Sequence, residues 1–366
     1  MIPFLVIVPI LLMIAFIGSN RLSKQSNNVN VNKRVHKLVI SLEKLICVLL
    51  LLSFWFLTAF RSIYIGNDTW NYVNIFSIIA TQGIMPTFYM EIGYQYFNLF
   101  VSKIFGHNPH VFLIVCATIS YFGITLYILK KSKNYYLSVC LTFCLLFSCY
   151  TNLIRQGLAM VLGIIAYQFI LKNKFFQAAA MIVLAMSIHY SAIVLFALFF
   201  YKYIPKNYTS ILIISALLFS ISISGSLNEL FIQIASRYQN YFESERVGTG
   251  YLALGYSLFY NLFFCLLAYM SYKDGFSLVH QKRLVIFVAS LLITCLSFNM
   301  NLISRLNNYY SILMIVELPN LFYDLKSRNR MWFAWGTCTA MIVSFILVQM
   351  LRPEWNHIIP YEFWSD

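Results

Sequence analysis

The stretch "FFQAAAMIVLAMSIHYSAIVLFALFFYKYIPK", residues 175–206, is mostly apolar; it begins beside the basic residues at 172–174 and ends with a second basic cluster, Lys202 and Lys206. Because basic loops of membrane proteins stay in the cytoplasm, both ends are expected inside. The chain must then cross outward and return, with its turn near "SIHYSA" at 187–192. Each half would measure roughly 21 Å as an α-helix, which is less than the roughly 30 Å hydrocarbon core. Short helices at membrane depth are tolerated where they line a protein cavity, so His189 is expected at a turn sunk into the outer leaflet.

The composition of the whole chain agrees with a membrane protein. Of its 366 residues, 60% are hydrophobic and 10% are charged, with a mean hydropathy of +0.74. A soluble domain carries roughly 25% charged residues, so the chain is expected to be an all-α polytopic integral membrane helical bundle, with residues 1–366 forming one transmembrane domain. The net charge of +14 lies in short clusters between apolar runs. That pattern reports topology and does not predict a nucleic-acid partner.

Hydropathy and basic loops together predict about 11–12 transmembrane segments, two of them half-length. Besides the two halves of 175–206, the expected spans are 2–18, 38–60, 110–129, 134–150, 154–171, 209–225, 251–271, 284–298, 307–323 and 331–351. The expected loops are a cytoplasmic basic loop at 20–37, larger outer-face loops at 61–109 and 226–250, an inner loop at 273–283 and an outer turn at 299–306. The run 92–105 is too short for an easy span and contains Lys103, so it is expected to be an interfacial or re-entrant helix.

The charges follow this threading. It places 19 of the 26 Lys and Arg residues inside. Six of the seven outer basic residues are arginines, whose planar fork grips phosphate and carboxylate. The first helix has its basic residues after it, which predicts a retained helix with its N-terminus outside rather than a signal peptide. The eight cysteines all lie in apolar runs without a CxxC pair, so they read as small buried hydrophobes, and neither a metal nor a cofactor is predicted.

Two outer positions carry the sharpest alternatives. Arg155 in "TNLIRQGLAMVLG" opens a helix and is either an interfacial arginine reaching the headgroups or an anion clamp for a lipid-linked phosphate. His189 is either a hydrogen-bonded histidine that fixes the turn or a general base. Asp68 in "IYIGNDTWNYVNIF", residues 63–76, is a carboxylate beside a Trp and a Tyr, and it is expected in a site at one membrane face.

The remaining polar candidates leave both structural and functional readings open. Arg305 sits in "NMNLISRLNNYY", where the excess of asparagine and tyrosine suggests sugar or phosphate contacts or a solvated loop. Glu91 in "EIGYQY" is expected to pair with an arginine or to serve the site. Arg246 belongs to the loop 226–250, which suits a sugar face or an amphipathic lid. Glu317, next to Pro319 within a span, is expected to be a paired structural carboxylate.

At these residues the chain resembles the EpsG/Wzy-type membrane polymerases of O-antigen and exopolysaccharide. The matching residues, in chain order, are Arg61, Gly66, Asp68 and Tyr72; Glu91, Gly93 and Tyr94; Arg155, Gln156 and Ala159; His189, Ser191 and Ala192; Arg305 and Tyr309; and Pro360, Tyr361 and Phe363. The resemblance runs from about residue 61 to the C-terminus.

The resemblance implies a processive, metal-independent glycosyltransferase at the outer face of a bacterial inner membrane, with no cofactor. A growing glycan would leave undecaprenyl diphosphate and join the sugar of an incoming lipid-linked repeat unit. Arg155 and Arg305 would bind the diphosphate, with Arg61 or Arg246 assisting, and His189 or Asp68 would be the base. The sugar or acceptor contacts would come from Glu91, Gln156, Tyr72, Tyr309 and Asn301. Membrane lipids, a chain-length regulator and a flippase of the same pathway are the expected partners.

Rival functions share parts of this pattern. An O-antigen ligase uses the same donor with a lipid A-core acceptor. A lipid-linked glycan flippase would need polar groups open to both leaflets, and the inner charges here read as ordinary loop lysines. A transferase with a monophosphate lipid donor usually shows an acidic pair on its first outer loop, where Asp68 stands alone. An accessory membrane scaffold is the remaining alternative.

The threading predicts that Asp68, Arg155, His189 and Arg305 lie at one membrane face. Single cysteines at these positions are expected to react with a membrane-impermeant maleimide added from outside the cell. A cysteine at Lys206, at the opposite face, is the control and is expected to react only after permeabilisation. Labelling of the four positions from opposite sides would contradict the threading.

Overall fold

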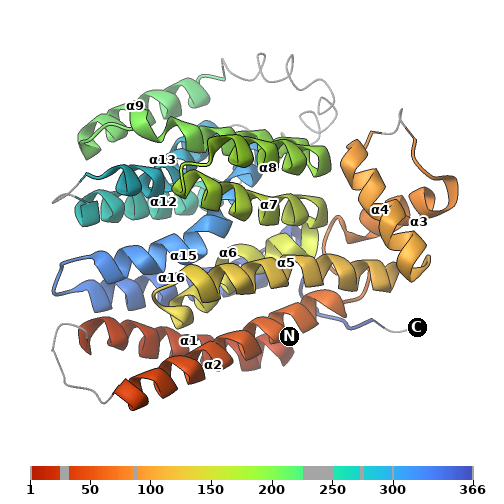
Figure 1. Ribbon diagram of the computed structural model, residues 1–366, viewed down its shortest axis with the longest axis horizontal. Coiled ribbons are helices and arrows are strands. Elements are labelled where there is room, and N and C mark those ends of the chain that lie inside the picture. Colours follow the sequence, from red (N-terminus) through yellow and green to blue (C-terminus); the bar gives the residue numbers. More distant parts are fainter. Residues whose placement is uncertain are drawn as a thin grey trace.

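The computed structural model describes residues 2–24, 33–85, 89–225, 251–272, 276–298 and 301–364, and it is a bundle of helices (Figure 1). Eight helices in these ranges are long and apolar enough to cross a membrane, and three more are apolar but shorter. This confirms the predicted polytopic helical membrane bundle. The helices that precede His189 are α1 (Ile2–Lys24), α2 (Lys33–Ala59), α3 (Thr69–Gln82), α4 (Ile92–Phe105), α5 (Pro109–Lys131), α6 (Tyr135–Asn152), α7 (Ile154–Leu171) and α8 (Phe175–Ile188). Those that follow it are η1 (Tyr190–Tyr203), α9 (Tyr208–Ile223), α12 (Tyr251–Tyr272), α13 (Leu278–Leu296), α14 (Asn301–Ser304), η3 (Arg305–Asn307), α15 (Asn308–Asp324), α16 (Arg330–Leu351) and η4 (Pro353–Trp355).

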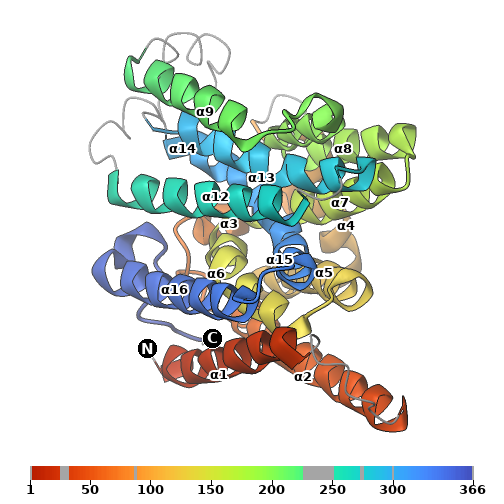
Figure 2. The ribbon, with the colours of Figure 1, turned by 90° about the vertical axis from the view of Figure 1, so that its left-hand side faces the viewer.

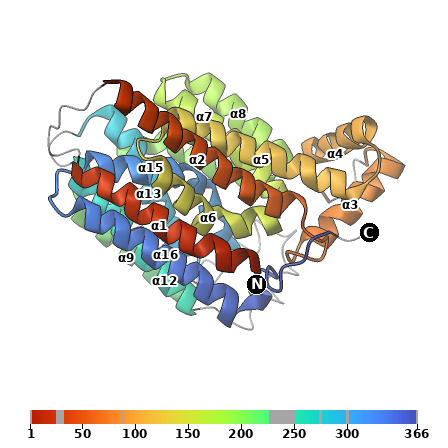
Figure 3. The same cartoon turned by 90° about the horizontal axis from the view of Figure 1, so that it is seen from below.

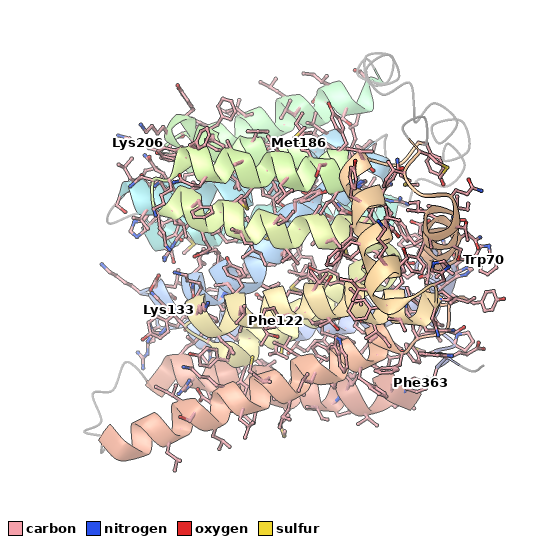
Figure 4. All side chains as sticks on the ribbon, turned by 45° about the vertical axis from the view of Figure 1, so that its right-hand side comes forward. Trp70, Phe122, Lys133, Met186, Lys206 and Phe363 are labelled. Carbon is pink, nitrogen blue, oxygen red and sulfur yellow. The ribbon has the colours of Figure 1, made fainter. Side chains whose placement is uncertain are left out.

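The long helices lie side by side, with α1 and α2 at one edge of the bundle and α9 at the opposite edge (Figures 1 and 2). The short helices α3 and α4 stand at one end, and the C-terminus lies at this same end (Figures 1 and 3). Lys133 and Lys206 lie at the other end, away from Trp70 and Phe363 (Figure 4). We call these the α3–α4 end and the lysine end. The threading predicted this separation of lysine-bearing loops from the 61–109 segment.

The stretch 175–206 folds as two 14-residue helices that meet at His189. The first, α8, is an α-helix, and it buries Ala178, Ile182 and Ala185 along one face. The second, η1, is a 3₁₀-helix. A 3₁₀-helix rises about 2.0 Å per residue, so η1 measures roughly 28 Å and reaches further than the predicted α-helical half. Because runs of 3₁₀-helix this long are uncommon and mark strain or function, the break at His189 is a special feature of the bundle.

The predicted short helix 92–105 is confirmed by α4, which has these same bounds. Its outward face is apolar, with Ile92, Tyr96, Phe100 and Ile104 all exposed. A stripe at four-residue spacing suits the membrane interface. The second short helix, α3, was not predicted, since the threading assigned its segment to the outer-face loop 61–109.

Two predicted inner loops are shorter in the structure. Helix α2 begins at Lys33 inside the predicted loop 20–37, of which 25–32 lie outside the described residues. Helix α13 begins at Leu278, so Lys282 is part of a helix and is buried. Its ammonium donates to the carbonyl of Ile170 at 2.7 Å and to Oδ1 of Asn173 at 2.6 Å. A lysine in this position satisfies carbonyls at the C-terminus of α7, so it is not the ordinary loop lysine that the sequence suggested. The predicted outer loop 226–250 lies outside the described residues.

The loop that follows α2 is held between the end of α6 and the C-terminal segment. The backbone N–H of Gly66 donates to the carbonyl of His357 at 3.0 Å. The side chain of Asn67 donates to the carbonyl of Trp355 at 2.8 Å, and its backbone N–H donates to Oδ1 of Asn152. The C-terminal segment therefore fixes the loop that carries Asp68.

Two independent features of this loop require glycine at position 66. Its φ is +90°, a left-handed value that favours glycine. A Cβ atom there would lie 2.4 Å from the carbonyl oxygen of Thr151, a rigid backbone atom. Any side chain at position 66 would therefore push the loop away from α6.

We predict that Gly66→Ala lowers the melting temperature of the detergent-solubilised protein by several degrees, because strain and steric overlap add together. Gly83→Ala is the matched control, since Gly83 also has a positive φ of 79° but has open space around its Cβ position. Gly83→Ala is destabilised only by the backbone strain, which is about 1 kcal/mol. Equal melting temperatures for the two variants would show that the packing of Gly66 on Thr151 does not matter.

Candidate functional site

Glu91 stands at the N-terminus of α4, where the helix is pressed against the end of α8. A Cβ atom on Gly93 would lie 2.6 Å from the carbonyl oxygen of Ser187. Only glycine fits at that distance, so Gly93 brings the start of α4 to the break that follows α8. This close approach gives the E-x-G-Y sequence its physical reason.

The carboxylate of Glu91 joins two residues that are distant in the sequence. Its Oε2 lies 2.5 Å from Nη1 of Arg155, at the start of α7. Its Oε1 accepts the backbone N–H of Tyr190 at 2.9 Å and lies 3.3 Å from Nδ1 of His189. The three side chains of this group, Glu91, Arg155 and His189, are 15–17% exposed. We call them the carboxylate triad.

Electrostatics set the protonation of the triad. Burial would raise the pKa of Glu91, but hydrogen bonds from His189 and Tyr190 and the charge of Arg155 outweigh it and lower the pKa to about 2. The glutamate is therefore ionised at neutral pH and can only accept hydrogen bonds. Burial lowers the pKa of His189, against the effect of Glu91, and the charges of Arg155 and Arg305 lower it further.

A neutral imidazole beside an ionised carboxylate has one sensible tautomer. Nδ1 carries the proton and donates it toward Glu91, which leaves a lone pair on Nε2. The same division of labour occurs in serine-protease triads, where a carboxylate orients the histidine and stabilises the imidazolium. The triad can therefore take a proton from a bound hydroxyl group.

Two tyrosines predicted for substrate contacts border the triad. Tyr72 on α3 is buried, and its hydroxyl contacts the guanidinium of Arg155. Burial raises the pKa of Tyr72 to about 12, so it remains a hydroxyl at neutral pH. Tyr309 on α15 is fully buried, and its hydroxyl lies 3.1 Å from Oγ of Ser191.

Arg305 lies in the short helix η3, and its side chain is exposed. Its charge acts on both His189 and Tyr72, so it belongs to the same neighbourhood as the triad. The position of η3 is fixed by Gln156, whose Nε2 donates to the carbonyl of Arg305 at 2.7 Å. Asn308 donates to Oε1 of the same glutamine at 3.2 Å. Gln156 thus uses its amide to hold Arg305.

Arg61 lies apart from the triad and is 1% exposed. Its guanidinium donates to the carbonyl of Thr58 and approaches Oγ1 of Thr69 at 3.4 Å. Burial lowers its pKa to about 10, and it stays charged at neutral pH. These contacts connect the end of α2 to the start of α3, and they do not turn the guanidinium toward the triad.

The other predicted residues are placed as follows. Asp68 is half-buried just before α3, and its charge acts on Tyr72. Asn301 is the first residue of α14. Arg246 lies outside the described residues. Among the residues that the structure describes, no cluster of three His, Cys, Asp or Glu side chains could hold a metal ion.

Sequence reasoning missed a cavity of about 610 Å³ beside Arg305. Asn261 and Ser290, from the middle of two spanning helices, form part of its wall. The available signal was an asparagine within the apolar run of α12, since polar side chains in a membrane span face the protein interior and mark function. A serine alone is too common in such helices to have drawn attention.

Comparison with known proteins places the chain in a family. No curated protein and no solved structure matches it. A model of the EpsG family matches residues 44–363, a range that includes the triad, Arg305 and the C-terminal segment. The chain therefore belongs to the EpsG family.

Proposed function

We propose that this protein is a polysaccharide polymerase that transfers a growing glycan from undecaprenyl diphosphate to an incoming lipid-linked repeat unit at the outer face of a bacterial inner membrane. The observation that carries the proposal is the carboxylate triad beside Arg305. Family membership supports polysaccharide polymerisation in general, and the triad supports a transfer step that begins with a hydroxyl group.

The acceptor is a sugar hydroxyl, and it needs a base when it attacks the anomeric carbon. His189 is the better placed of the two predicted bases, because Glu91 orients it and can stabilise its cation. Asp68 has no side-chain hydrogen bond at the start of α3 and is assigned a supporting position. As the bond from the hydroxyl oxygen to the anomeric carbon forms, its proton passes to Nε2 of His189, and the bond to the diphosphate oxygen breaks.

The leaving group is a lipid diphosphate, and negative charge develops on it as it departs. Cations fixed near that oxygen stabilise the transition state. Arg305 is exposed and makes no salt bridge in the described part of the chain, so we assign the diphosphate to it. Arg155 shares its charge with Glu91 and acts partly through the triad. We assign Arg61 to holding the end of α2 against the start of α3. Arg246 remains a predicted contact of the diphosphate.

A gel of lipid-linked glycan from cells that lack the protein tests the function directly. Single repeat units on the carrier are expected, because chain lengthening is the missing step. Long polymer that is not attached to its final acceptor would instead indicate a ligase. Carrier-linked glycan trapped at the inner face would indicate a flippase.

Arg305→Ala is predicted to leave the protein inserted and abundant but to remove chain lengthening, because the leaving group loses its cation. Glycan length on a gel and protein level on a blot measure the two effects. Arg352→Ala is the matched control, since Arg352 is an exposed arginine at the same end that pairs with Glu354 at 3.6 Å. Wild-type polymer from Arg305→Ala would contradict the assignment.

The rate of polymerisation is predicted to fall as the pH drops below the ordinary pKa of histidine, because protonated His189 cannot accept the acceptor's proton. Glu91 raises the pKa of His189, so Glu91→Gln is expected to move this acid limb to lower pH. The same change is expected to cut the rate at neutral pH by about 10² or more, since the imidazolium loses its partner. Initial rates in membrane vesicles across pH 5–8 provide the measurement.

Asp68→Asn separates the two candidate bases. If His189 is the base, the acid limb of Asp68→Asn stays where it is in the wild type. A limb that disappears in Asp68→Asn but persists in Glu91→Gln would transfer the role of base to Asp68.

A further inference from the structure

The cavity beside Arg305 has a polar wall built from membrane-spanning helices. Asn261 of α12 and Ser290 of α13 meet Asn307 of η3 there. Amide and hydroxyl side chains are costly within a membrane unless they serve a protein interior or a ligand. Their convergence on one cavity therefore calls for a functional explanation.

Counting donors and acceptors shows that this wall is incomplete. Oγ of Ser290 lies 2.7 Å from Oδ1 of Asn261 and 3.2 Å from Oδ1 of Asn307. A serine hydroxyl has one hydrogen, so it satisfies one of the two amide oxygens at a time. Both asparagines donate to Oγ1 of Thr294, at 3.0 and 2.8 Å, and Thr294 donates to the carbonyl of Ser290. The threonine hydrogen is thus already used, and an added O–H donor would complete the network.

The rest of the lining combines aromatic faces with few charges. Tyr256 and Tyr260 of α12 line the cavity, with ring centroids 4.3 Å apart. Among the described lining residues, Arg305 and Glu354 are the charged ones, and both side chains are exposed. A volume of about 610 Å³ lies within the usual range for ligand sites, roughly 300–1,000 Å³. The interior suits a neutral ligand rich in hydroxyl groups, and the Arg305 side suits an anion.

We propose that this cavity binds the neutral sugars next to the diphosphate of the lipid-linked donor. Asn261, Ser290 and Asn307 hydrogen-bond the sugar hydroxyls, the tyrosines cover the sugar faces, and Arg305 holds the attached diphosphate. This proposal rests on the proposed function for the identity of the glycan. A single arginine at the edge of the cavity then connects sugar binding to the triad, because the charge of Arg305 also acts on His189.

The test measures binding to the purified full-length protein in lipid nanodiscs with two probes. One probe is the lipid-linked glycan extracted from cells that lack the protein, and the other is undecaprenyl diphosphate without sugar. Asn261→Ala is expected to weaken binding of the glycan probe about tenfold and to leave the sugar-free probe unchanged. Arg305→Ala is expected to weaken the binding of both.

A second variant guards against disruption of the network by Asn261→Ala. Ser311 of α15 lines the cavity and is half-buried, so Ser311→Phe fills the space while leaving Asn261 and Ser290 unchanged. The Ser311→Phe substitution is expected to weaken binding of the glycan probe by more than tenfold. Ser220→Phe, at an exposed position of α9, is the matched control and is expected to bind both probes as the wild type does.

The outcomes separate this proposal from the proposed function. The sugar site would be overturned if both cavity variants bound the glycan probe as tightly as the wild-type protein, or if they bound both probes equally weakly. Chain lengthening by the wild-type protein would still uphold the polymerase in that case. If the cavity variants selectively lose binding of the glycan probe but the wild-type protein lengthens no chains, the sugar site is upheld and the polymerase is overturned.

Discussion

The carboxylate of Glu91 holds together three segments that the chain separates by up to 99 positions. It binds the start of α7 through Arg155 and the break between α8 and η1 through His189 and Tyr190. Removing one partner from a largely buried ion pair leaves an uncompensated charge, which costs more than the pair itself contributes. The interrupted helix α8–η1 therefore depends on Glu91, and so does the orientation of the imidazole. Gly93 is part of the same constraint, because it admits α4 to the surface of α8.

A second constraint acts on the loop between α2 and α3. The C-terminal segment runs back along this loop, with Ser62 bonded to Glu362 and Trp364 bonded to Phe60 through the backbone. Residues near the two ends of the family match thus lie in contact. The loop and the segment also contribute Asn67 and Trp355 to the cavity. The C-terminal segment therefore supports the loop before α3 and one wall of the cavity.

The sequence predicted much of the fold because membrane helices are constrained by length and by charge. The basic clusters at 172–174 and 202–206 were enough to place the break near His189. The helix α3 was missed, since its polar residues hide an apolar face formed by Val73, Phe76 and Ile79. A pairing of Glu91 with an arginine was one of two readings, but the sequence did not identify Arg155 as the partner, and the contact with His189 depends on packing at Gly93. The role predicted for Arg61 stays a prediction, because a sequence pattern cannot tell an arginine that binds phosphate from a buried one that donates to a backbone carbonyl, as Arg61 does to Thr58.

Two arginine–glutamate clusters in this protein show how such cases can be told apart. Glu317 is 3% exposed on its side chain, lies 3.4 Å from Arg283 and accepts the hydroxyl of Tyr167 at 3.1 Å, as expected for a paired structural carboxylate. It joins α15 to α13 and α7 toward the lysine end, and it does not line the cavity beside Arg305. Glu91 is more exposed, orients a titratable imidazole, and has a second arginine nearby. The Glu317 pair is sealed by its neighbours, whereas the Glu91 pair shares its surroundings with an imidazole and an exposed arginine, which makes it the candidate for chemistry.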